Sequence, residues 1–306
     1  IAVRWPNFAP GQLALGRELV SSLDEGALSV LSQDAEAGIG ALKAYAQLVP
    51  DDPRVWRELA QAYEQLNKAA EAEAAYRTAI RHDNSYLDHH AALVNFLLDQ
   101  EELEKAKAAF AQMLKASTDR DEAFEYLDNE EGFDIDSAKI REELLKAFPK
   151  EVGESQAGLR MLAELQETQN KNAEAIKTLQ RSIAIEATVE DYESLSRLYR
   201  QQRRFTEALA AANSGLKLDD SAISLQFERA CSLAQLGRKR EAIAALKEAM
   251  EEESDQFFDL DEPDLKPLAA MPEFKALKEK AKELLTPSEP VPAEQGKPVK
   301  PKTGNQ

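Results

Sequence analysis

The side chains of this sequence that could do chemistry are charged groups at helical spacing, three histidines and one cysteine. Arg160, Arg197 and Arg200 would fall on one side of neighbouring helices, where guanidinium groups could bind an acidic or phosphorylated peptide. The alternative is that they pair with carboxylates on the same or adjacent helices, as charges on helix faces usually do. The candidate carboxylates are Glu164, Glu167, Glu190 and Glu193. Both interpretations stay open from the sequence.

Two acidic clusters, residues 119–136 and 251–264, raise the question of calcium binding. An EF-hand loop needs Gly at its sixth place and Glu at its twelfth. The first cluster lacks this pattern when Gly132 is set at the sixth place, and the second contains no Gly. His89 and His90 are adjacent, so on a helix they diverge by about 100° and cannot readily share a metal ion. We therefore predict no metal and no cofactor, and we expect solvated loops or a patch for a basic partner.

Catalytic motifs are missing from the sequence. It contains no nucleophile elbow, P-loop, dinucleotide fingerprint or zincin motif. Cys231 is the single cysteine, which excludes an intramolecular disulfide and a cysteine-based metal cage. It has no identified histidine partner, so we predict a buried structural cysteine and a protein that is not an enzyme.

Charge and hydropathy narrow the class of partner and the location. The formal net charge is −18 at pH 7, which argues against non-specific nucleic-acid binding because phosphate contact needs a basic face. No run approaches about 18 apolar residues, so we predict no transmembrane segment. The low cysteine count fits a reducing compartment, and we predict a cytoplasmic protein. The alternative is a periplasmic or membrane-anchored protein, if a signal or anchor precedes Ile1.

The elements that position these side chains are helices that recur with a period of 34 residues. Trp56, Leu59 and Tyr63 form an apolar stripe on one helix, and the small Ala72 and Ala79 follow on the next. The equivalent places 34 residues later are held by Leu93, Val94, Leu97, Ala106, Phe110 and Met113. One pair of helices cannot bury its own stripe, so the period predicts stacked helix pairs rather than one closed core.

This pattern resembles the tetratricopeptide repeat (TPR) consensus. The places that carry the resemblance are Trp56, Leu59, Ala60, Tyr63, Ala72, Tyr76 and Ala79. It covers roughly residues 20–256, and it is strong in 53–120 and 156–249. The resemblance implies an all-α fold, a right-handed α-solenoid of stacked antiparallel helix pairs, also called a TPR superhelix.

The expected organisation follows the repeats. We expect an N-terminal lead-in and the start of a first helix at 1–18, an N-terminal array at 19–150, a C-terminal array at 151–256, a turn and capping helix at 257–286, and a Pro/Lys-rich disordered tail at 287–306. Helix pairs are expected at 53–86, 87–120, 156–188, 189–222 and 223–256, with degenerate units at 19–52 and 121–150. Residues 259–280 are similar to the ending found after the last repeat of many bacterial TPR proteins. In the degenerate unit at 121–150, a helix near 136–148 is expected to end at Pro149.

TPR proteins present a concave groove that is lined mainly by the first helix of each pair. The resemblance implies that the groove here exposes Arg57, Gln61, Glu64, Gln65, Ala91, Asn95, Leu98, Asp99, Arg160, Glu164, Glu167, Glu193, Arg197, Arg200 and Gln201. The carboxylate clamp of chaperone-binding TPR proteins is rejected, because Ala92 stands where the clamp needs Asn. The register of the last repeat leaves Phe227 and Cys231 facing either the groove or the core.

The resemblance implies a non-catalytic adaptor or assembly scaffold that binds a protein or peptide segment in this groove, with an acidic segment as one candidate. Two alternatives are kept. One is an envelope-associated assembly factor with an anchor upstream of Ile1, and the other is a regulatory or substrate-presenting subunit of an enzyme complex.

Overall fold

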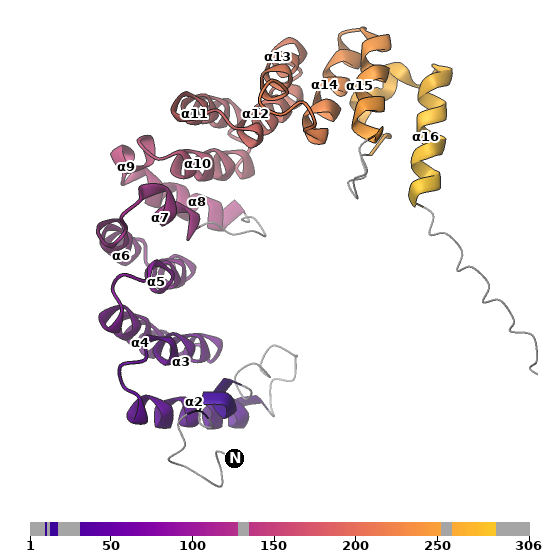
Figure 1. The fold of residues 1–306 in the computed structure, drawn as a ribbon. Coiled ribbons are helices and arrows are strands. Elements are labelled where there is room, and N and C mark those ends of the chain that lie inside the picture. Colours follow the sequence, from indigo (N-terminus) through magenta and orange to yellow (C-terminus); the bar gives the residue numbers. More distant parts are fainter. Residues whose placement is uncertain (1–9, 11–12, 18–30, 128–134, 252–258, 286–306) are drawn as a thin grey trace, which may run out of the picture. The chain divides into compact units, whose positions relative to one another are not determined.

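The computed structural model describes residues 10, 13–17, 31–127, 135–251 and 259–285, and within these ranges the chain is all-α. Figure 1 shows helices that follow one another in antiparallel pairs. The five regular pairs are α3 (Pro53–Gln65) with α4 (Ala69–His82), α5 (Leu87–Asp99) with α6 (Leu103–Ala116), α10 (Gln156–Thr168) with α11 (Asn172–Ile185), α12 (Val189–Gln201) with α13 (Phe205–Gly215), and α14 (Ile223–Gln235) with α15 (Lys239–Glu251). The predicted all-α solenoid of helix pairs is confirmed.

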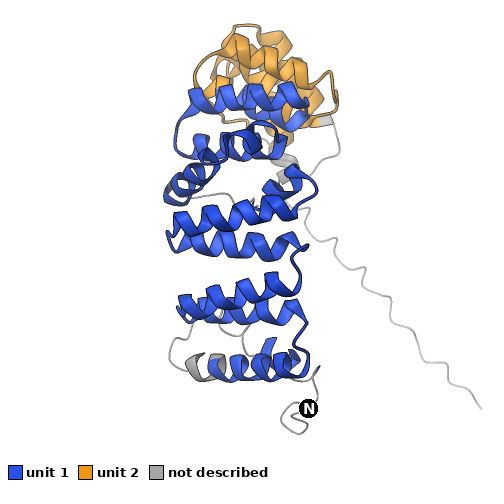
Figure 2. Ribbon diagram, turned by 90° about the vertical axis from the view of Figure 1, so that its left-hand side faces the viewer, with its two compact units in different colours: residues 1–198 blue, residues 199–306 orange. Residues whose placement is uncertain are grey.

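The chain divides into two compact units, residues 1–198 and 199–306, and the division falls inside α12. In unit 1, α2 (Leu31–Leu48) packs on α3, and α4 packs on both α3 and α5. Figure 2 shows the helices of unit 1 lying one above another in successive layers. The predicted division of the repeats into arrays at 19–150 and 151–256 stays a prediction.

Local sequence sets the ends of these helices. Asp52 is the N-cap of α3, its side chain accepts a hydrogen bond from the Arg54 amide at 3.1 Å, and Pro53 starts the helix where a missing N–H does no harm. The turns between the two helices of the five pairs each contain one residue with positive φ. These residues are Asn67, Glu101, Asn170, Arg203 and Gly237, with φ between 55° and 77°. A tight left-handed turn therefore recurs in every regular pair.

The core follows the predicted large-against-small pattern. Leu59, Ala72 and Ala79 are buried, while Trp56 and Tyr63 pack partly buried against the same cluster. Small side chains let neighbouring helices approach closely enough to leave few voids between them. Packing is tightest at Gly158 on α10, where an added Cβ would lie 3.1 Å from the ring of Phe124.

The degenerate unit in the middle of unit 1 differs from the expectation in one respect. It contains α7 (Arg120–Glu125), α8 (Ile135–Lys146) and α9 (Pro149–Gly153). The helix expected near 136–148 is α8, which ends at Lys146, and Pro149 is the first residue of the short α9, which the sequence did not predict. Proline fits there because the first turn of a helix needs no amide donor. α8 packs against both α5 and α10 and so fills the place between two regular pairs.

In unit 2, a 3-10 helix η2 (Pro263–Leu268) and α16 (Pro272–Leu285) follow the last pair. Leu265, Leu268 and Phe274 share one buried cluster with Leu246 of α15 and Cys231 of α14. Cys231 therefore faces the core, which resolves the register that the sequence left open. The predicted tail at 287–306 lies outside the described residues. No helix in the described ranges has the length and apolar character needed to span a bilayer.

Candidate functional site

The first cleft of unit 1 lies between α3 and α5 and has a volume of about 770 Å³. Its lining includes four residues that the resemblance placed in the groove, Arg57, Gln61, Glu64 and Asn95, together with Gln65 and Asp99. Its apolar part is formed by Leu42, Tyr76, Ala92 and Phe96. The predicted groove residues of these two repeats thus gather around one cleft.

Ala91 and Leu98 correct the expected register on α5. Both were expected to be exposed in the groove, and both are 2% exposed. α5 is buried on most sides, and its less buried residues are Asp88, Ala92, Asn95 and Asp99. These follow i, i+4, i+7, i+11 spacing, which is one stripe of a helix. The groove stripe therefore runs through Ala92 rather than Ala91.

The arginines of the first cleft are already paired. Arg17 Nε donates to Glu58 Oε1 at 2.6 Å, and Arg57 forms an ion pair with Asp88. Glu64 is held differently, since its Oε2 accepts a hydrogen bond from the Tyr76 hydroxyl at 2.8 Å. Burial raises the pKa of Glu64, the Tyr76 hydrogen bond opposes that rise, and the nearby charge of Asp99 adds to it. Glu64 is thus a half-buried carboxylate with a neutral partner.

Arg141 of the degenerate unit also reaches the first cleft, and sequence reasoning missed it. Its Nη1 donates to Asn95 Oδ1 at 2.7 Å, and its Nη2 lies 3.8 Å from Asp99 Oδ1. Asn95 is therefore positioned by a residue 46 places further along the chain. Residues 121–150 do not follow the repeat consensus. The position of Arg141 could therefore not be carried over from the regular repeats.

The second cleft lies between the end of α5, the start of α6 and α8, with a volume of about 620 Å³. Leu98, Leu103 and Ile140 form its apolar part. Its charged residues are Asp99, Glu101, Asp136, Lys139 and Glu143. Asp99 lines both the first and the second cleft, so the two are neighbours on unit 1.

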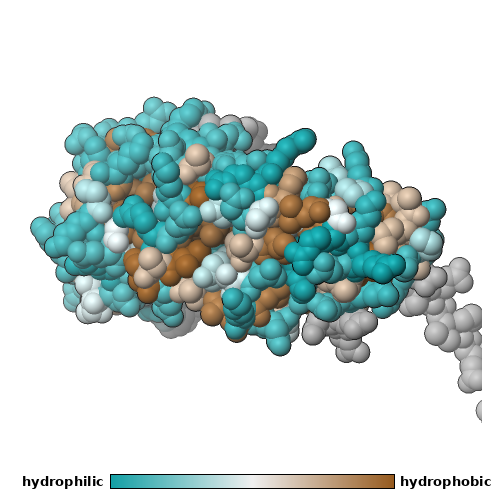
Figure 3. Space-filling model, turned by 90° about the horizontal axis from the view of Figure 1, so that it is seen from above, coloured by the Kyte–Doolittle hydropathy of each residue, from teal (hydrophilic) through white to brown (hydrophobic). Residues whose placement is uncertain are grey.

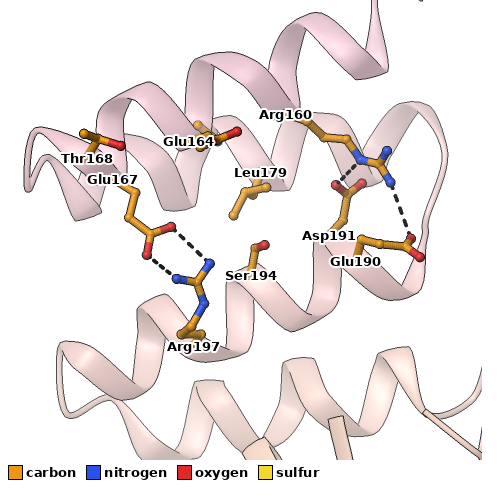
Figure 4. A pocket seen from close by; sticks show the side chains of 10 residues that line it. Arg160, Glu164, Glu167, Thr168, Leu179, Glu190, Asp191, Ser194 and Arg197 are labelled. Carbon is orange, nitrogen blue, oxygen red and sulfur yellow. Dashed lines mark hydrogen bonds and ion pairs between the residues drawn. The ribbon is translucent and has the colours of Figure 1, made fainter. Parts of the chain in front are cut away.

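The third cleft lies between α10 and α12 in unit 1 and has a volume of about 680 Å³ (Figure 4). Arg160 Nε donates to Asp191 Oδ1 at 3.0 Å, and its Nη2 lies 3.4 Å from Glu190 Oε2. Arg197 donates to both oxygens of Glu167, at 2.5 and 3.2 Å. The predicted groove residues Arg160, Glu164 and Arg197 all line this cleft. Asp191 is buried and also accepts a hydrogen bond from Ser182 at 3.0 Å, so its role is to hold α12 in place.

Arg200 lies in unit 2, outside these three clefts. Glu228 binds its guanidinium at 2.9 and 3.2 Å, and Glu262 and Asp264 each accept from its Nη1 at 2.7 Å. These carboxylates raise the pKa of Arg200 despite its burial. The interpretation of Arg160, Arg197 and Arg200 as a stripe open to an acidic ligand was wrong in this respect, because all three are paired with carboxylates. The alternative of pairing is confirmed, and Glu167 and Glu190 are among its expected partners.

The remaining candidate residues from the sequence lie outside the three clefts. Gln201 is exposed beside Arg200 and lies outside the three clefts. Glu262 and Asp264 belong to the second acidic cluster, so part of that cluster holds Arg200 rather than forming a solvated loop. In the first cluster, Asp119 caps α7, and Asp121 accepts a hydrogen bond from Ser155 at 2.5 Å.

The buried cysteine predicted from the sequence is confirmed, since Cys231 is fully buried and burial raises the pKa of its thiol. His89 and His90 are also buried. His90 Nε2 lies 3.0 Å from the Asn84 carbonyl oxygen, whereas neither ring nitrogen of His89 has a hydrogen-bond partner among the residues described. No group of three or more metal-binding side chains occurs within the described ranges.

Apolar side chains are exposed outside the clefts as well. Among them are Leu48, Ile185 and Leu218, which are 41%, 49% and 52% exposed. Figure 3 shows one face of the molecule, on which apolar patches are interrupted by hydrophilic side chains. The clefts of unit 1 therefore remain the best-defined candidate sites.

Residues 32–86 and 194–256 match the family model described as tetratricopeptide repeat. No curated protein matches the chain. Among solved structures, the MamA protein is 15% identical with a TM-score of 0.36, and the match covers 66% of this chain and 92% of that chain. A thermophilic TPR protein of Thermus thermophilus is 18% identical with a TM-score of 0.32, covering 74% and 98%, and yeast Tom70 is 14% identical with a TM-score of 0.44, covering 92% and 57%.

Proposed function

The chain belongs to the tetratricopeptide repeat family, and on this premise we propose that it is a non-catalytic adaptor or assembly scaffold that binds a segment of a partner protein in the clefts of unit 1. The TPR fold is typical of protein-interaction adaptors in general. The observation that supports the finer proposal is the gathering of predicted groove residues around two clefts. These residues are Arg57, Gln61, Glu64 and Asn95 in the first cleft and Arg160, Glu164 and Arg197 in the third.

The chemistry of the clefts suits recognition of a chain segment. Each combines an apolar floor with polar and charged groups at the rim, and each volume lies between 620 and 770 Å³. Partner side chains can bury apolar area on such a floor while polar groups fix their register. A cytoplasmic location, and the alternative of an envelope-associated factor, stay predictions.

The test uses substitutions that fill a cleft without changing its charge. Ala92→Trp fills the first cleft and Ser194→Trp fills the third, whereas Ala108→Trp on the exposed side of α6 is the matched control. The tagged full chain and its variants are used to capture partners from the native source, and bound proteins are quantified by mass spectrometry. We expect the same partner on the wild type and on Ala108→Trp, and a loss of about tenfold or more when its cleft is filled.

Two results contradict the proposal. One is capture of the same proteins in the same amounts by all four chains, with their helical signal intact. The other is reproducible turnover of a substrate by the isolated chain that a single cleft substitution abolishes.

A further inference from the structure

We propose that the segment bound in the first and second clefts is basic and amphipathic, with lysine or arginine side chains that meet the cleft carboxylates and apolar side chains that cover the cleft floor. This inference rests on the proposed function and names the chemistry of the partner. It replaces the acidic partner that the sequence suggested as a candidate.

The charge of the linings supports a basic partner. Among the residues that line the first cleft, the carboxylates Glu58, Glu64 and Asp99 outnumber Arg17 and Arg57, and a further arginine, Arg141, lies 3.8 Å from Asp99. In the second cleft, one lysine, Lys139, stands among four carboxylates, which are Asp99, Glu101, Asp136 and Glu143. A segment with the opposite charge is attracted to such a lining, and a like-charged one is repelled.

The arginines near the first and second clefts are already bound by groups of the protein itself, which leaves them less available to an acidic ligand. Arg17 is held by Glu58 and Arg57 by Asp88. Arg141, the third arginine near these clefts, donates to Asn95 and is only 8% exposed. An acidic ligand would have to displace groups that the fold has already placed at hydrogen-bonding distance, and this competition weakens its binding.

Glu64 marks the place where a partner cation fits best. Among the described residues, no lysine or arginine forms an ion pair with Glu64, and its carboxylate is held by the neutral hydroxyl of Tyr76 at 2.8 Å. Burial and the charge of Asp99 both raise the pKa of Glu64, which means that they destabilise its charged form relative to its protonated form. A partner cation beside Glu64 would favour the carboxylate form and would make charge-assisted hydrogen bonds with it.

The floor of the clefts explains why charge alone is not enough. The half-buried Ala92 lies in the first cleft, and the half-buried Leu103 and Ile140 line the second, above the buried Phe96 and Leu98. Apolar side chains of the partner can be buried on this floor. A purely polar lysine-rich chain would leave it open to water, so the proposal requires both characters in one segment.

The experiment measures binding of two labelled synthetic peptides to the purified full chain by fluorescence anisotropy at about 0.15 M salt, where long-range attraction is screened. One peptide alternates leucine and lysine in an amphipathic pattern, and the other carries glutamate in place of every lysine. The variant is Glu64→Gln with Asp99→Asn, which keeps the side-chain shapes. The control is Glu71→Gln with Glu104→Gln, two exposed carboxylates on the second helices α4 and α6.

We expect the lysine peptide to bind and the glutamate peptide to bind at least about tenfold more weakly. The cleft variant should lose about tenfold or more of the affinity for the lysine peptide, while the control variant changes it little. Equal losses in both double variants would overturn the inference, because the attraction would then belong to the whole acidic surface. Tighter binding of the glutamate peptide would overturn it as well.

The proposed function is tested separately, since Ala92→Trp blocks the first cleft without changing its charge. If Ala92→Trp removes partner capture but the Glu64→Gln, Asp99→Asn variant does not, the cleft is a binding site and the basic partner is wrong. If neither change affects capture but Ser194→Trp removes it, the partner lies in the third cleft and the inference drawn here is wrong, and if none of the three affects capture, the proposed function itself fails.

Discussion

Arg200 provides the sharpest test of how unit 2 is held together. Its side chain is 11% exposed, and that of Glu228 is 7% exposed. The guanidinium joins the end of α12 to Glu228 of α14 and to Glu262 and Asp264 beside η2. Arg200→Met removes the cation and leaves three carboxylates close together. Breaking a buried ion pair in this way costs about 3 kcal/mol or more, and we take about 3 kcal/mol because Glu262 and Asp264 are partly exposed.

Cys231 supplies the assay, because it is the single cysteine and is fully buried in the core of unit 2. Alkylation of its thiol under native conditions requires local opening of that core. A loss of about 3 kcal/mol corresponds to roughly a hundredfold faster alkylation, measured relative to the denatured chain. The exposed Arg238, paired with Glu241 three residues away, gives the matched control Arg238→Met, which should leave the rate unchanged.

A second arm separates the ion pair from the loss of packing. In Arg200→Met with Glu228→Gln the most buried carboxylate is neutral, so the alkylation rate should return part of the way to that of the wild type. The reasoning is refuted if Arg200→Met alkylates as slowly as the wild type and as Arg238→Met.

Three further predictions concern local stability. Glu101→Gly and Arg203→Gly relieve side chains held at φ 58°, so each should stabilise the chain by about 0.5–1 kcal/mol in urea unfolding; unchanged midpoints would contradict the strain. Gly158→Ala should destabilise by about 1–3 kcal/mol, because the added Cβ meets the buried ring of Phe124 at 3.1 Å; a neutral result in the same assay would show that the ring moves aside. Burial lowers the pKa of His89 below its ordinary 6.5, so the unfolded state takes up the proton first and stability falls as pH drops below 6.5. The melting temperature of the wild type should therefore fall more between pH 7 and about 5.5 than that of His89→Leu, and parallel curves would contradict this.

The helices and the groove positions could be predicted because both depend on a local period. The apolar stripe of a helix needs only neighbours three and four residues away, and a fixed repeat length carries a position from one pair to the next. Arg57, Gln61 and Glu64, which the resemblance placed in the groove, line the first cleft. The carry-over slipped by one residue on α5, where Ala91 is buried and Ala92 lines the cleft. The stripe of α5 could not be identified from its sequence, because this helix is apolar on most of its surface.

The pairing of charges could not be predicted to the same extent. Arg141 reaches Asn95 across 46 residues, and Arg200 reaches Asp264 across 64. Such contacts depend on how the degenerate unit and η2 stack on their neighbours, and neither follows the repeat. The role of Pro149 escaped prediction for a related reason, since proline is equally suited to follow one helix and to begin the next.

The paired arginines and the acidic clefts have one cause. In unit 1, Arg57 pairs with Asp88, Arg160 with Asp191 and Arg197 with Glu167, in each case between the first helices of two neighbouring pairs. An arginine that pairs with a carboxylate of a neighbouring helix is no longer available as a free cation on the surface. Because the chain has a net charge of −18, a surplus of carboxylates remains. A partner cation would compete with these arginines at most of the cleft carboxylates. Glu64 escapes this competition because Tyr76, a neutral group, is what holds it. A basic partner should therefore depend on Glu64 more than on Glu58, and Glu58→Gln should weaken binding of the lysine peptide less than Glu64→Gln does.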